Sequence, residues 1–373
     1  MELFVTTPDL PTPLLLSTLT IVSVVVCYVL FWKQQAAARR APLPPGPRGW
    51  PVLGNLPQLG GKTHQTLHEM TKVYGPLLRL RFGSSTVVVA GSAAVAQQFL
   101  RAHDANFSSR PPNSGGELMA YNYQDVVFAP YGPRWRAMRK VCAVNLFSAR
   151  ALDDVRGVRE REAALMVRSL AEQAHGGLDA PPAAVPVGKA INVCTTNALS
   201  RAAVGRRVFA AAGGDGGARE FKEIVLNVGD FVPALRWLDP QGVAAKMKKL
   251  HRRFDDMMDE IIAGYREARR VAADGEESKD LLGLLLSMVD ERPFDSGEEV
   301  RITETDVKAL ILNLFVAGTD TTSTIVEWSL AELIRHPEIL RQAQEEMDAV
   351  AGRGRLVTES DLRSLTFFNA VIK

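Results

Sequence analysis

The chain has 373 residues, of which 46% are hydrophobic and 23% are charged, and its formal net charge is +2. This composition is that of a globular protein with a sizeable core, and the net charge is too small to indicate a nucleic-acid partner. The three cysteines, Cys27, Cys142 and Cys194, are widely spaced and form no C-x-x-C pair. Their number and spacing argue against a disulfide framework and a structural zinc site, and favour a reducing compartment.

The first element along the chain is an apolar segment near the N-terminus. No charged residue occurs between Asp9 and Lys33, and the run from Leu14 to Trp32 is almost wholly apolar. A helix over about 14–32 would rise about 28 Å, which is close to the hydrocarbon thickness of a bilayer. We therefore predict a transmembrane helix within an anchor formed by residues 1–41.

A cleaved signal peptide is the alternative, since the alanines at 36–38 resemble a cleavage site. Signal peptides carry positive charge before the apolar stretch, whereas here acidic residues precede it and Lys33, Arg39 and Arg40 follow it. This charge bias predicts a retained anchor with the rest of the chain on the cytoplasmic side. Residues 42–51 are rich in proline and predict a stiff, extended hinge, either a generic linker or a lever between membrane and body.

The body, residues 52–373, is predicted to be mainly α with a small β-sheet. Alternating apolar residues from Leu77 to Ala90 around Gly83 predict a hairpin. Three-to-four spacing of apolar residues predicts seven helices. Their predicted ranges are Ala93–Ala102, Arg134–Phe147, Ala151–Gln173, Phe221–Val228, Val243–Ala272, Lys279–Val289 and about Thr303–His336. A basic run that begins at Lys246 and ends at Arg253 is interpreted as a solvated helix face rather than a membrane or nucleic-acid patch.

The last of these helices is the longest and is predicted to be the central one. Thr303 and Asp306 have the spacing of a capping box, and Pro337 closes the pattern. In its middle lies the sequence AGTDTT, residues 317–322, which is a poor helix former. One interpretation is functional: Gly318 admits a flat ligand, threonine hydroxyls open the helix, and a buried Asp320 belongs to a proton relay. The other is a kinked core helix with a solvated aspartate.

The order of three motifs resembles the cytochrome P-450 family of haem–thiolate monooxygenases. These motifs are PPGP at residues 44–47, Trp135-x-x-x-Arg139, and AG-x-DTT at residues 317–322. Further segments are similar to the plant flavonoid 3′-hydroxylases. They are RAHDANF at residues 101–107, YNYQD at 121–125, FAPYG at 128–132 and FVPALRWLD at 231–239. The resemblance extends over the whole chain and implies a cytochrome P-450-like fold behind an N-terminal transmembrane helix.

The resemblance also implies a cofactor, partners and a set of site residues. Haem b would be held by Trp135 and Arg139 through a propionate, with Ala317 and Gly318 beside the haem face. The less favoured alternatives are a core aromatic for Trp135 and a surface cation for Arg139. Asp320 and Thr321 would deliver protons to oxygen. The substrate pocket would draw on residues 110–128, 313–317 and 231–237. The pocket residues singled out are Tyr121, Phe128, Asn313 and Phe315.

The implied reaction is hydroxylation of the flavonoid B-ring at the 3′ position with dioxygen and electrons from an NADPH–cytochrome reductase, at the endoplasmic reticulum membrane. No residue is predicted to ligate a metal, because the family's F-x-x-G-x-R-x-C-x-G segment is absent and the three cysteines are interpreted as small buried hydrophobes. We therefore expect an incomplete monooxygenase domain, inactive as it stands, which is either a fragment of a working enzyme or a product that ends early. The alternatives are a non-catalytic, membrane-anchored helical protein and a related plant hydroxylase acting on another phenolic.

Overall fold

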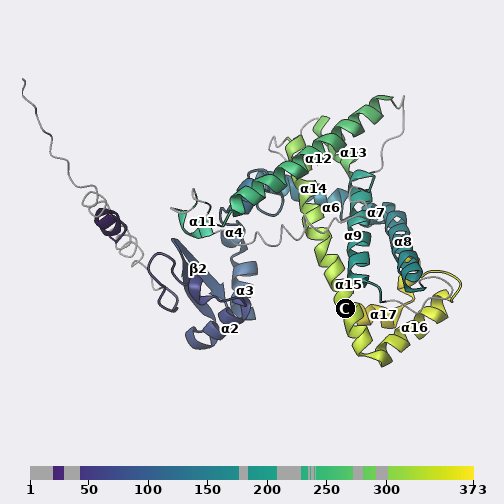
Figure 1. Cartoon of the computed structure of the whole chain (residues 1–373), viewed down its shortest axis with the longest axis horizontal. Coiled ribbons are helices and arrows are strands. Elements are labelled where there is room, and N and C mark those ends of the chain that lie inside the picture. Colours follow the sequence, from purple (N-terminus) through teal and green to yellow (C-terminus); the bar gives the residue numbers. More distant parts are fainter. Residues whose placement is uncertain are drawn as a thin grey trace, which may run out of the picture. The chain divides into compact units, whose positions relative to one another are not determined.

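The computed structural model describes residues 20–28, 43–175, 184–207, 228–233, 236, 239, 241–271, 280–290 and 301–373. Within these residues the chain is mainly helical, with one two-stranded sheet (Figure 1). The predicted fold class, mainly α with a small β-sheet, is thereby confirmed. The chain divides into two compact units, Met1–Gln98 and Phe99–Lys373.

The predicted anchor is described only in part. Residues 20–28 are helical, and apolar side chains such as Ile21 and Val24 are 63% and 67% exposed. The remainder of the predicted span, residues 14–19 and 29–32, lies outside the described residues. Transmembrane insertion of this segment stays a prediction.

The first unit is built on the predicted hairpin. Strand β1 (Leu77–Phe82) pairs antiparallel with β2 (Ser85–Ala90), in a register that places Leu77 opposite Ala90. Alternate residues of β1, Leu78 and Leu80, are fully buried, as the period of a strand with one covered face requires. The unit also contains a short 3₁₀ helix (Leu56–Gln58), α2 (Thr63–Tyr74) and α3 (Ala93–Gln97).

The proline-rich segment is hydrogen-bonded to this unit from Pro45 onward. The backbone N–H of Arg79 in β1 donates to the carbonyl of Pro45 at 2.9 Å, and Asn55 Nδ2 donates to the carbonyl of Pro47 at 3.3 Å. Prolines cannot donate such bonds but can accept them. This part of the predicted hinge is therefore an edge of the β unit, which its proline content alone did not indicate.

The second unit is helical. A π-helical stretch, Gln98–Ala102, crosses the boundary between the units. The second unit continues through α4 (Asp104–Phe107), α5 (Ser114–Leu118), α6 (Pro133–Asn145), α7 (Ala149–Asp154), α8 (Arg156–His175), α9 (Val187–Val204) and α11 (Val228–Phe231). It is completed by α12 (Val243–Val271), α13 (Leu281–Asp290), α14 (Glu304–Gly318), α15 (Asp320–Arg335), α16 (Pro337–Ala351), a 3₁₀ helix (Glu359–Arg363) and α17 (Thr366–Ile372).

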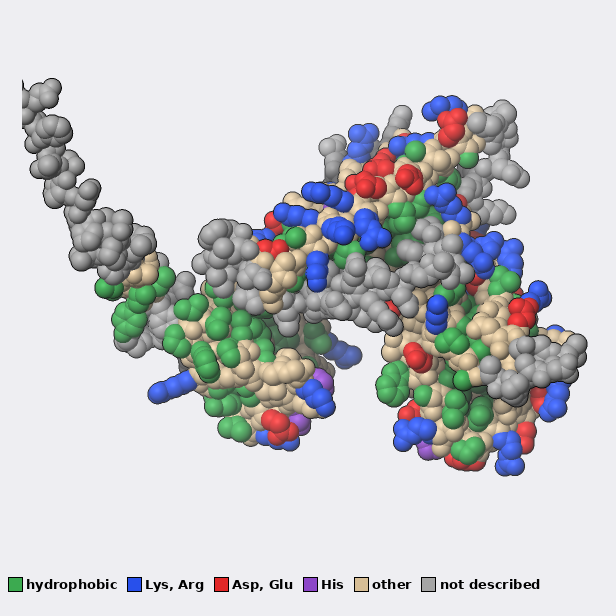
Figure 2. All heavy atoms as spheres, in the orientation of Figure 1, with side chains coloured by type: hydrophobic (Ala, Val, Ile, Leu, Met, Phe, Trp, Pro, Cys, Tyr) green, Lys and Arg blue, Asp and Glu red, His purple; other side chains and the backbone are tan. Residues whose placement is uncertain are grey.

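Most predicted helices are found, with two differences. The predicted helix 151–173 is two helices, because Ser148 caps α7 through the N–H of Ala151 and the chain turns at Val155 before α8. The predicted helix 221–228 falls outside the described residues except for Val228, which begins α11. Along α12, Lys and Arg side chains gather near the start of the helix, and Asp and Glu side chains form a group farther along (Figure 2). The basic run from Lys246 to Arg253 is exposed at each of its five Lys and Arg positions, as expected of a solvated face.

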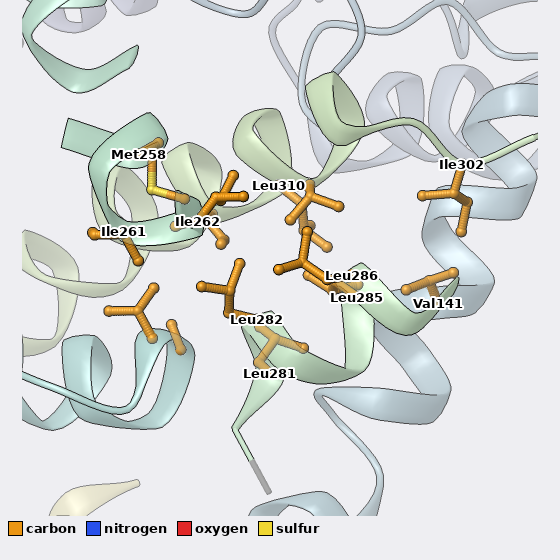
Figure 3. Close-up of a cluster of buried hydrophobic side chains, with 14 of the residues drawn as sticks. Val141, Met258, Ile261, Ile262, Leu281, Leu282, Leu285, Leu286, Ile302 and Leu310 are labelled. Atoms are coloured by element: carbon orange, nitrogen blue, oxygen red, sulfur yellow. The ribbon is translucent and has the colours of Figure 1, made fainter. Parts of the chain in front are cut away.

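The core of the second unit surrounds α14. Leu310 and Ile311 are 2% and 0% exposed, and side chains from α6, α9, α12 and α13 pack around them (Figure 3). Among the described residues, Glu304–Arg335 is the one helix long and apolar enough to cross a membrane. Because its first half is the centre of this core, we interpret it as the predicted central helix.

The start of the central helix is capped as predicted. Thr303 Oγ1 accepts a hydrogen bond from the N–H of Asp306 at 3.3 Å, and Asp306 Oδ2 accepts one from the N–H of Thr303 at 2.8 Å. This reciprocal pair satisfies two backbone donors that the first turn of any helix leaves free. At its far end α15 stops at Arg335, two residues before Pro337.

Candidate functional site

The central helix is interrupted in the middle of the AGTDTT sequence. Helix α14 ends at Gly318 and α15 begins at Asp320, with Thr319 between them. Thr321 Oγ1 donates to the carbonyl oxygen of Ala317 at 2.6 Å, and Ser323 Oγ donates to that of Asp320 at 3.1 Å. Hydroxyls that bond to carbonyls of the preceding turn compete with the backbone ladder. The predicted bond from a threonine hydroxyl to a preceding carbonyl is therefore present where the helix is interrupted.

One side of this interruption packs against α9. Thr319 and Ser323 are 6% and 7% exposed. A Cβ atom at Gly318 would lie 3.0 Å from Leu199 Cδ2, and Thr195 Oγ1 lies 3.5 Å from the carbonyl oxygen of Thr319. The missing side chain of Gly318 therefore serves the close approach of two helices in this structure, rather than the approach of a ligand on that side.

The other side of the interruption is open. Ala317, Thr321 and Thr324 are exposed, and so are the larger Ile325 and Trp328, at 63% and 65%. Their spacing of three to four residues places them on one helical face. Small side chains at its start and large apolar ones farther along make this face accessible to a flat, apolar group. Asp320 lies beside it and is half-buried rather than fully buried.

The residues predicted to hold a haem propionate lie on α6. Arg139 is exposed and makes no ion pair with any residue that the structure describes, so its guanidinium is available to a carboxylate. The indole N–H of Trp135 donates instead to the carbonyl of Val126 at 3.0 Å, and its ring lies 5.5 Å from that of Tyr131. The open face of Ala317 and Thr321 and the side chain of Arg139 fit a haem, while the Trp135 donor is committed to the 125–128 loop.

The predicted substrate residues occupy three different environments. Phe315 is 8% exposed and belongs to the hydrophobic core. Tyr121 is half-buried in a left-handed turn, with φ of 48°, and its hydroxyl donates to Asp255 Oδ1 at 2.9 Å. Burial and this hydrogen bond raise the pKa of Tyr121. Phe128 is half-buried, and its backbone N–H donates to Asp125 Oδ1 at 2.8 Å.

Asn313 is joined to the same loop. Its Nδ2 donates to Asp125 Oδ2 at 2.9 Å, and its Oδ1 accepts from the N–H of Val126 at 3.0 Å. The carboxylate of Asp125 is 1% exposed. Asp125 thereby brings two predicted substrate residues, Asn313 and Phe128, into one bonded group. The sequence placed Asp125 in a segment similar to flavonoid 3′-hydroxylases but gave it no role.

A second polar group was missed by the sequence reasoning. Lys308 on α14 is 9% exposed, and its Nζ lies 2.9 Å from Asp255 Oδ1 and 2.5 Å from Asp259 Oδ1 of α12. Burial would raise the pKa of Asp255, but hydrogen bonds from Lys308 and Tyr121 outweigh it and lower that pKa. The available signal was a lysine among the apolar residues 307–312 of a helix predicted to be central, since a buried charge needs a partner.

Cys142 and Cys194 are not prepared to act as thiolates. Burial raises the pKa of Cys142, which is 3% exposed, and burial together with the charge of Glu162 raises the pKa of Cys194 to about 11. Cys27 is exposed within the helix of residues 20–28. Among the described residues no group of three or more His, Cys, Asp or Glu side chains is arranged to hold a metal ion.

Comparison with known proteins agrees with this geometry. The family model described as cytochrome P450 matches residues 44–373. A flavonoid 3′-monooxygenase of Oryza sativa subsp. japonica is 71% identical over 98% of the chain and 70% of its own length. A flavonoid 3′-monooxygenase of Crocosmia x crocosmiiflora is 55% identical over 96% and 69%. A flavonoid 3′,5′-hydroxylase of Solanum melongena is 38% identical over 95% and 68%. The protein is therefore a member of the cytochrome P450 family.

Proposed function

We propose that the protein is a haem-dependent monooxygenase that hydroxylates the flavonoid B-ring at the 3′ position, using dioxygen and electrons from an NADPH–cytochrome reductase. The observation that carries this proposal is the interrupted central helix, with a small-residue face open at Ala317 and Thr321 and an adjacent carboxyl at Asp320. The 3′ position is favoured because the relative named for it in Oryza sativa is 71% identical, whereas the named 3′,5′-hydroxylases of Crocosmia x crocosmiiflora and Solanum melongena are 51% and 38% identical.

In this proposal the haem supplies the activation of dioxygen when it is bound, and the chain's own side chains position groups and move protons. Ala317 flanks the haem face, with the backbone of Gly318 next to it in the chain, and Arg139 pairs with a propionate. The hydroxyl of Thr321 holds a proton that is directed at the Ala317 carbonyl in this structure. The neighbouring carboxyl of Asp320 can return a proton to that hydroxyl after it has been given up, which is general acid–base work.

The substrate side of the site is proposed to involve Tyr121 and Phe128 from one segment, whereas Phe315, also predicted to bind substrate, lies in the hydrophobic core. Aromatic side chains suit a planar, phenolic ligand, because they offer a large apolar surface at low entropic cost. Residues 1–41 are proposed to anchor the protein in the endoplasmic reticulum membrane and residues 42–51 to connect this anchor to the body, 52–373, on the cytoplasmic side.

None of the three cysteines is proposed to ligate the haem iron. A thiolate ligand must lose its proton, and the raised pKa values of Cys142 and Cys194 oppose that loss. Cys27 belongs to the predicted anchor. The chain spans 70% of the length of the Oryza sativa relative. The hydroxylation reaction and the ligation of the iron are therefore best tested in two separate experiments.

The test uses a fusion in which residues 1–373 replace the matching 70% of the Oryza sativa relative. Expressed in microsomes with a reductase and supplied with naringenin or kaempferol, this fusion is expected to form the 3′-hydroxylated product. Thr321→Ala in the fusion is expected to lower the rate of hydroxylation by about 100-fold, at the lower end of what a positioned proton donor contributes. Thr324→Ala, which alters an exposed threonine on the same face, should retain most of the rate.

The 373-residue chain by itself is the control for the iron ligand. Reduced and exposed to carbon monoxide, it is expected to lack the absorption band of thiolate-ligated haem, and such a band would contradict the assignment of its cysteines. A fusion that shows the band but hydroxylates neither flavonoid would overturn the proposed substrate and favour a different phenolic. Equal losses in the two threonine variants would remove the role given to Thr321.

A further inference from the structure

The segment between Gln124 and Phe128 is held to two helices by hydrogen bonds that use its backbone. Asn313 of α14 accepts from the N–H of Val126, and Trp135 of α6 donates to the carbonyl of the same residue. Both backbone groups of Val126 are thus paired with side chains, and its own side chain packs against the main core. This double attachment fixes the position of the segment along the axis of the central helix.

The acidic residue of the segment is held by neutral donors. The two carboxylate oxygens of Asp125 accept from the N–H of Phe128 and from Nδ2 of Asn313, at 2.8 and 2.9 Å. Asp125 is 1% exposed and makes no ion pair with any described residue. Burial of a charge is costly unless its hydrogen bonds are made. The positions of both donors are therefore closely prescribed by this one carboxylate.

The location of this group connects it with the candidate site. Asn313 precedes Ala317 by four residues, which is about one turn or 6 Å along the helix. The segment that Asn313 holds ends at Phe128, and its preceding turn carries Tyr121, whose hydroxyl is bonded to α12. The same side chain of α14 thus lies one turn from the open haem-facing residues and holds the aromatic segment.

Both polar atoms of Asn313 are used within the protein, which leaves one N–H of its amide for any other contact. This makes Asn313 better suited to holding the segment than to binding substrate directly. We define the Asp125–Asn313 clamp as these two side chains together with the N–H groups of Val126 and Phe128. The clamp joins residues that are 188 positions apart in the chain.

We propose that the Asp125–Asn313 clamp is a positioning device that sets which flavonoid fits beside the central helix, by fixing Phe128 and its segment relative to Ala317. This inference rests on the proposed function and deepens it, because it names two residues that act on selectivity through Phe128 rather than by touching the substrate. Loss of the clamp changes the discrimination between flavonoids of different ring shape, and not only the stability of the fold.

The chemistry of the clamp allows a reciprocal exchange. In Asp125→Asn, whichever way the two amides turn, one of their N–H groups faces another N–H group. In Asn313→Asp, two carboxylates face each other in a buried position. In the double variant Asp125→Asn with Asn313→Asp, the new carboxylate accepts from Val126 and from the new amide, whose oxygen accepts from Phe128. Every bond of the clamp is then made again, and only the bond between residues 125 and 313 has its direction reversed.

The experiment compares these three variants of the full 373-residue chain with the unaltered chain. Hydrogen exchange at the amides of Val126 and Phe128 is expected to be roughly tenfold faster or more in each single variant, the loss expected from an unsatisfied buried hydrogen bond, and to return close to the original rate in the double variant. Asn122→Asp is the matched control for Asn313→Asp, because it adds the same charge at an exposed position of the turn that precedes the segment.

Selectivity is the second readout, measured as the ratio of dissociation constants for naringenin and kaempferol. The single variants are expected to change this ratio by about fivefold and the double variant to restore it, whereas general destabilisation would weaken both ligands alike. Unchanged exchange and an unchanged ratio in both single variants would overturn the inference while leaving the proposed function intact. Absence of binding by the unaltered chain would count against the proposed function, and with it the selectivity role. Unchanged hydrogen exchange at Val126 and Phe128 in the single variants would then refute the clamp itself.

Discussion

Leu310→Ala is expected to lower the free energy of unfolding of the helical unit by about 2–5 kcal/mol, the usual cost of truncating a fully buried leucine. Leu310 is 2% exposed on α14 and lies among side chains of α12 and α13 that include Ile262, Leu282 and Leu285 (Figure 3). The loss has two parts: the transfer free energy of the removed atoms and the cavity that the surrounding helices cannot close. Urea titration of the 373-residue chain followed by helical circular dichroism would measure it.

Leu330→Ala is the matched control for this prediction. It removes the same atoms from the same long helix, but Leu330 on α15 is 38% exposed. We expect a loss below about 1 kcal/mol there, because a partly solvated side chain leaves no closed cavity. Equal losses at the two positions would mean that α14 is not the centre of the core, and would weaken every inference drawn from its position.

The sequence was a good guide wherever the signal was local. Thr303 and Asp306 predicted the start of the long helix and Pro337 predicted its end. In the structure the helix begins and ends within one or two residues of these positions. The hairpin was equally predictable, because strand alternation on both sides of Gly83 is a short-range pattern. The interruption at residues 317–322 could be predicted for the same reason, since glycine and threonine oppose helix within a single turn.

What the sequence could not predict depends on contacts between distant residues. The partner of Gly318 is Leu199 of α9, and the sequence analysis had not predicted a helix at Val187–Val204. Asn313 and Asp125 meet across 188 positions, and nothing in the spacing of either residue indicates the other. The donor of Trp135 was assigned to a propionate by the family resemblance. In the structure its N–H is bonded to Val126 instead.

The two residues proposed to transfer protons, Thr321 and Asp320, also differ in whether local or distant contacts determine their surroundings. Thr321 behaves as a local rule predicts, because a threonine hydroxyl reaches the carbonyl four residues earlier in almost any helix. The environment of Asp320 depends on what covers the open face of α14 and α15, and within this chain Asp320 is half-buried rather than fully buried. Its proposed role in proton transfer therefore requires the haem and substrate to complete its surroundings.

Gly54→Ala is expected to disrupt the β unit strongly, because it adds a methyl group at a positive φ and against the backbone of β1. Gly54 has φ of 65°, and a Cβ atom would lie 2.1 Å from the carbonyl oxygen of Arg81 in β1. That oxygen accepts the N–H of Asn55 at 2.6 Å, so it cannot move away without breaking the pairing. We expect the free energy of unfolding of the β unit to fall by about 3 kcal/mol or more, since left-handed strain alone costs about 1–3 kcal/mol. Fluorescence of Trp50, which pairs with Gly54, would follow local unfolding.

Gly60→Ala is the control that separates the clash of an added methyl group from the cost of a positive φ. Gly60 has nearly the same conformation, with φ of 61°, but the nearest atom to its Cβ would be Thr66 Oγ1 at 3.9 Å. The free energy of unfolding of this variant should therefore fall only by the cost of placing a side chain in the left-handed region, about 1–2 kcal/mol. If Gly54→Ala lost no more than Gly60→Ala, the segment 53–55 would have to lie farther from β1 than the structure shows. The close contact that joins the proline-rich segment and the hairpin into one unit would then be absent.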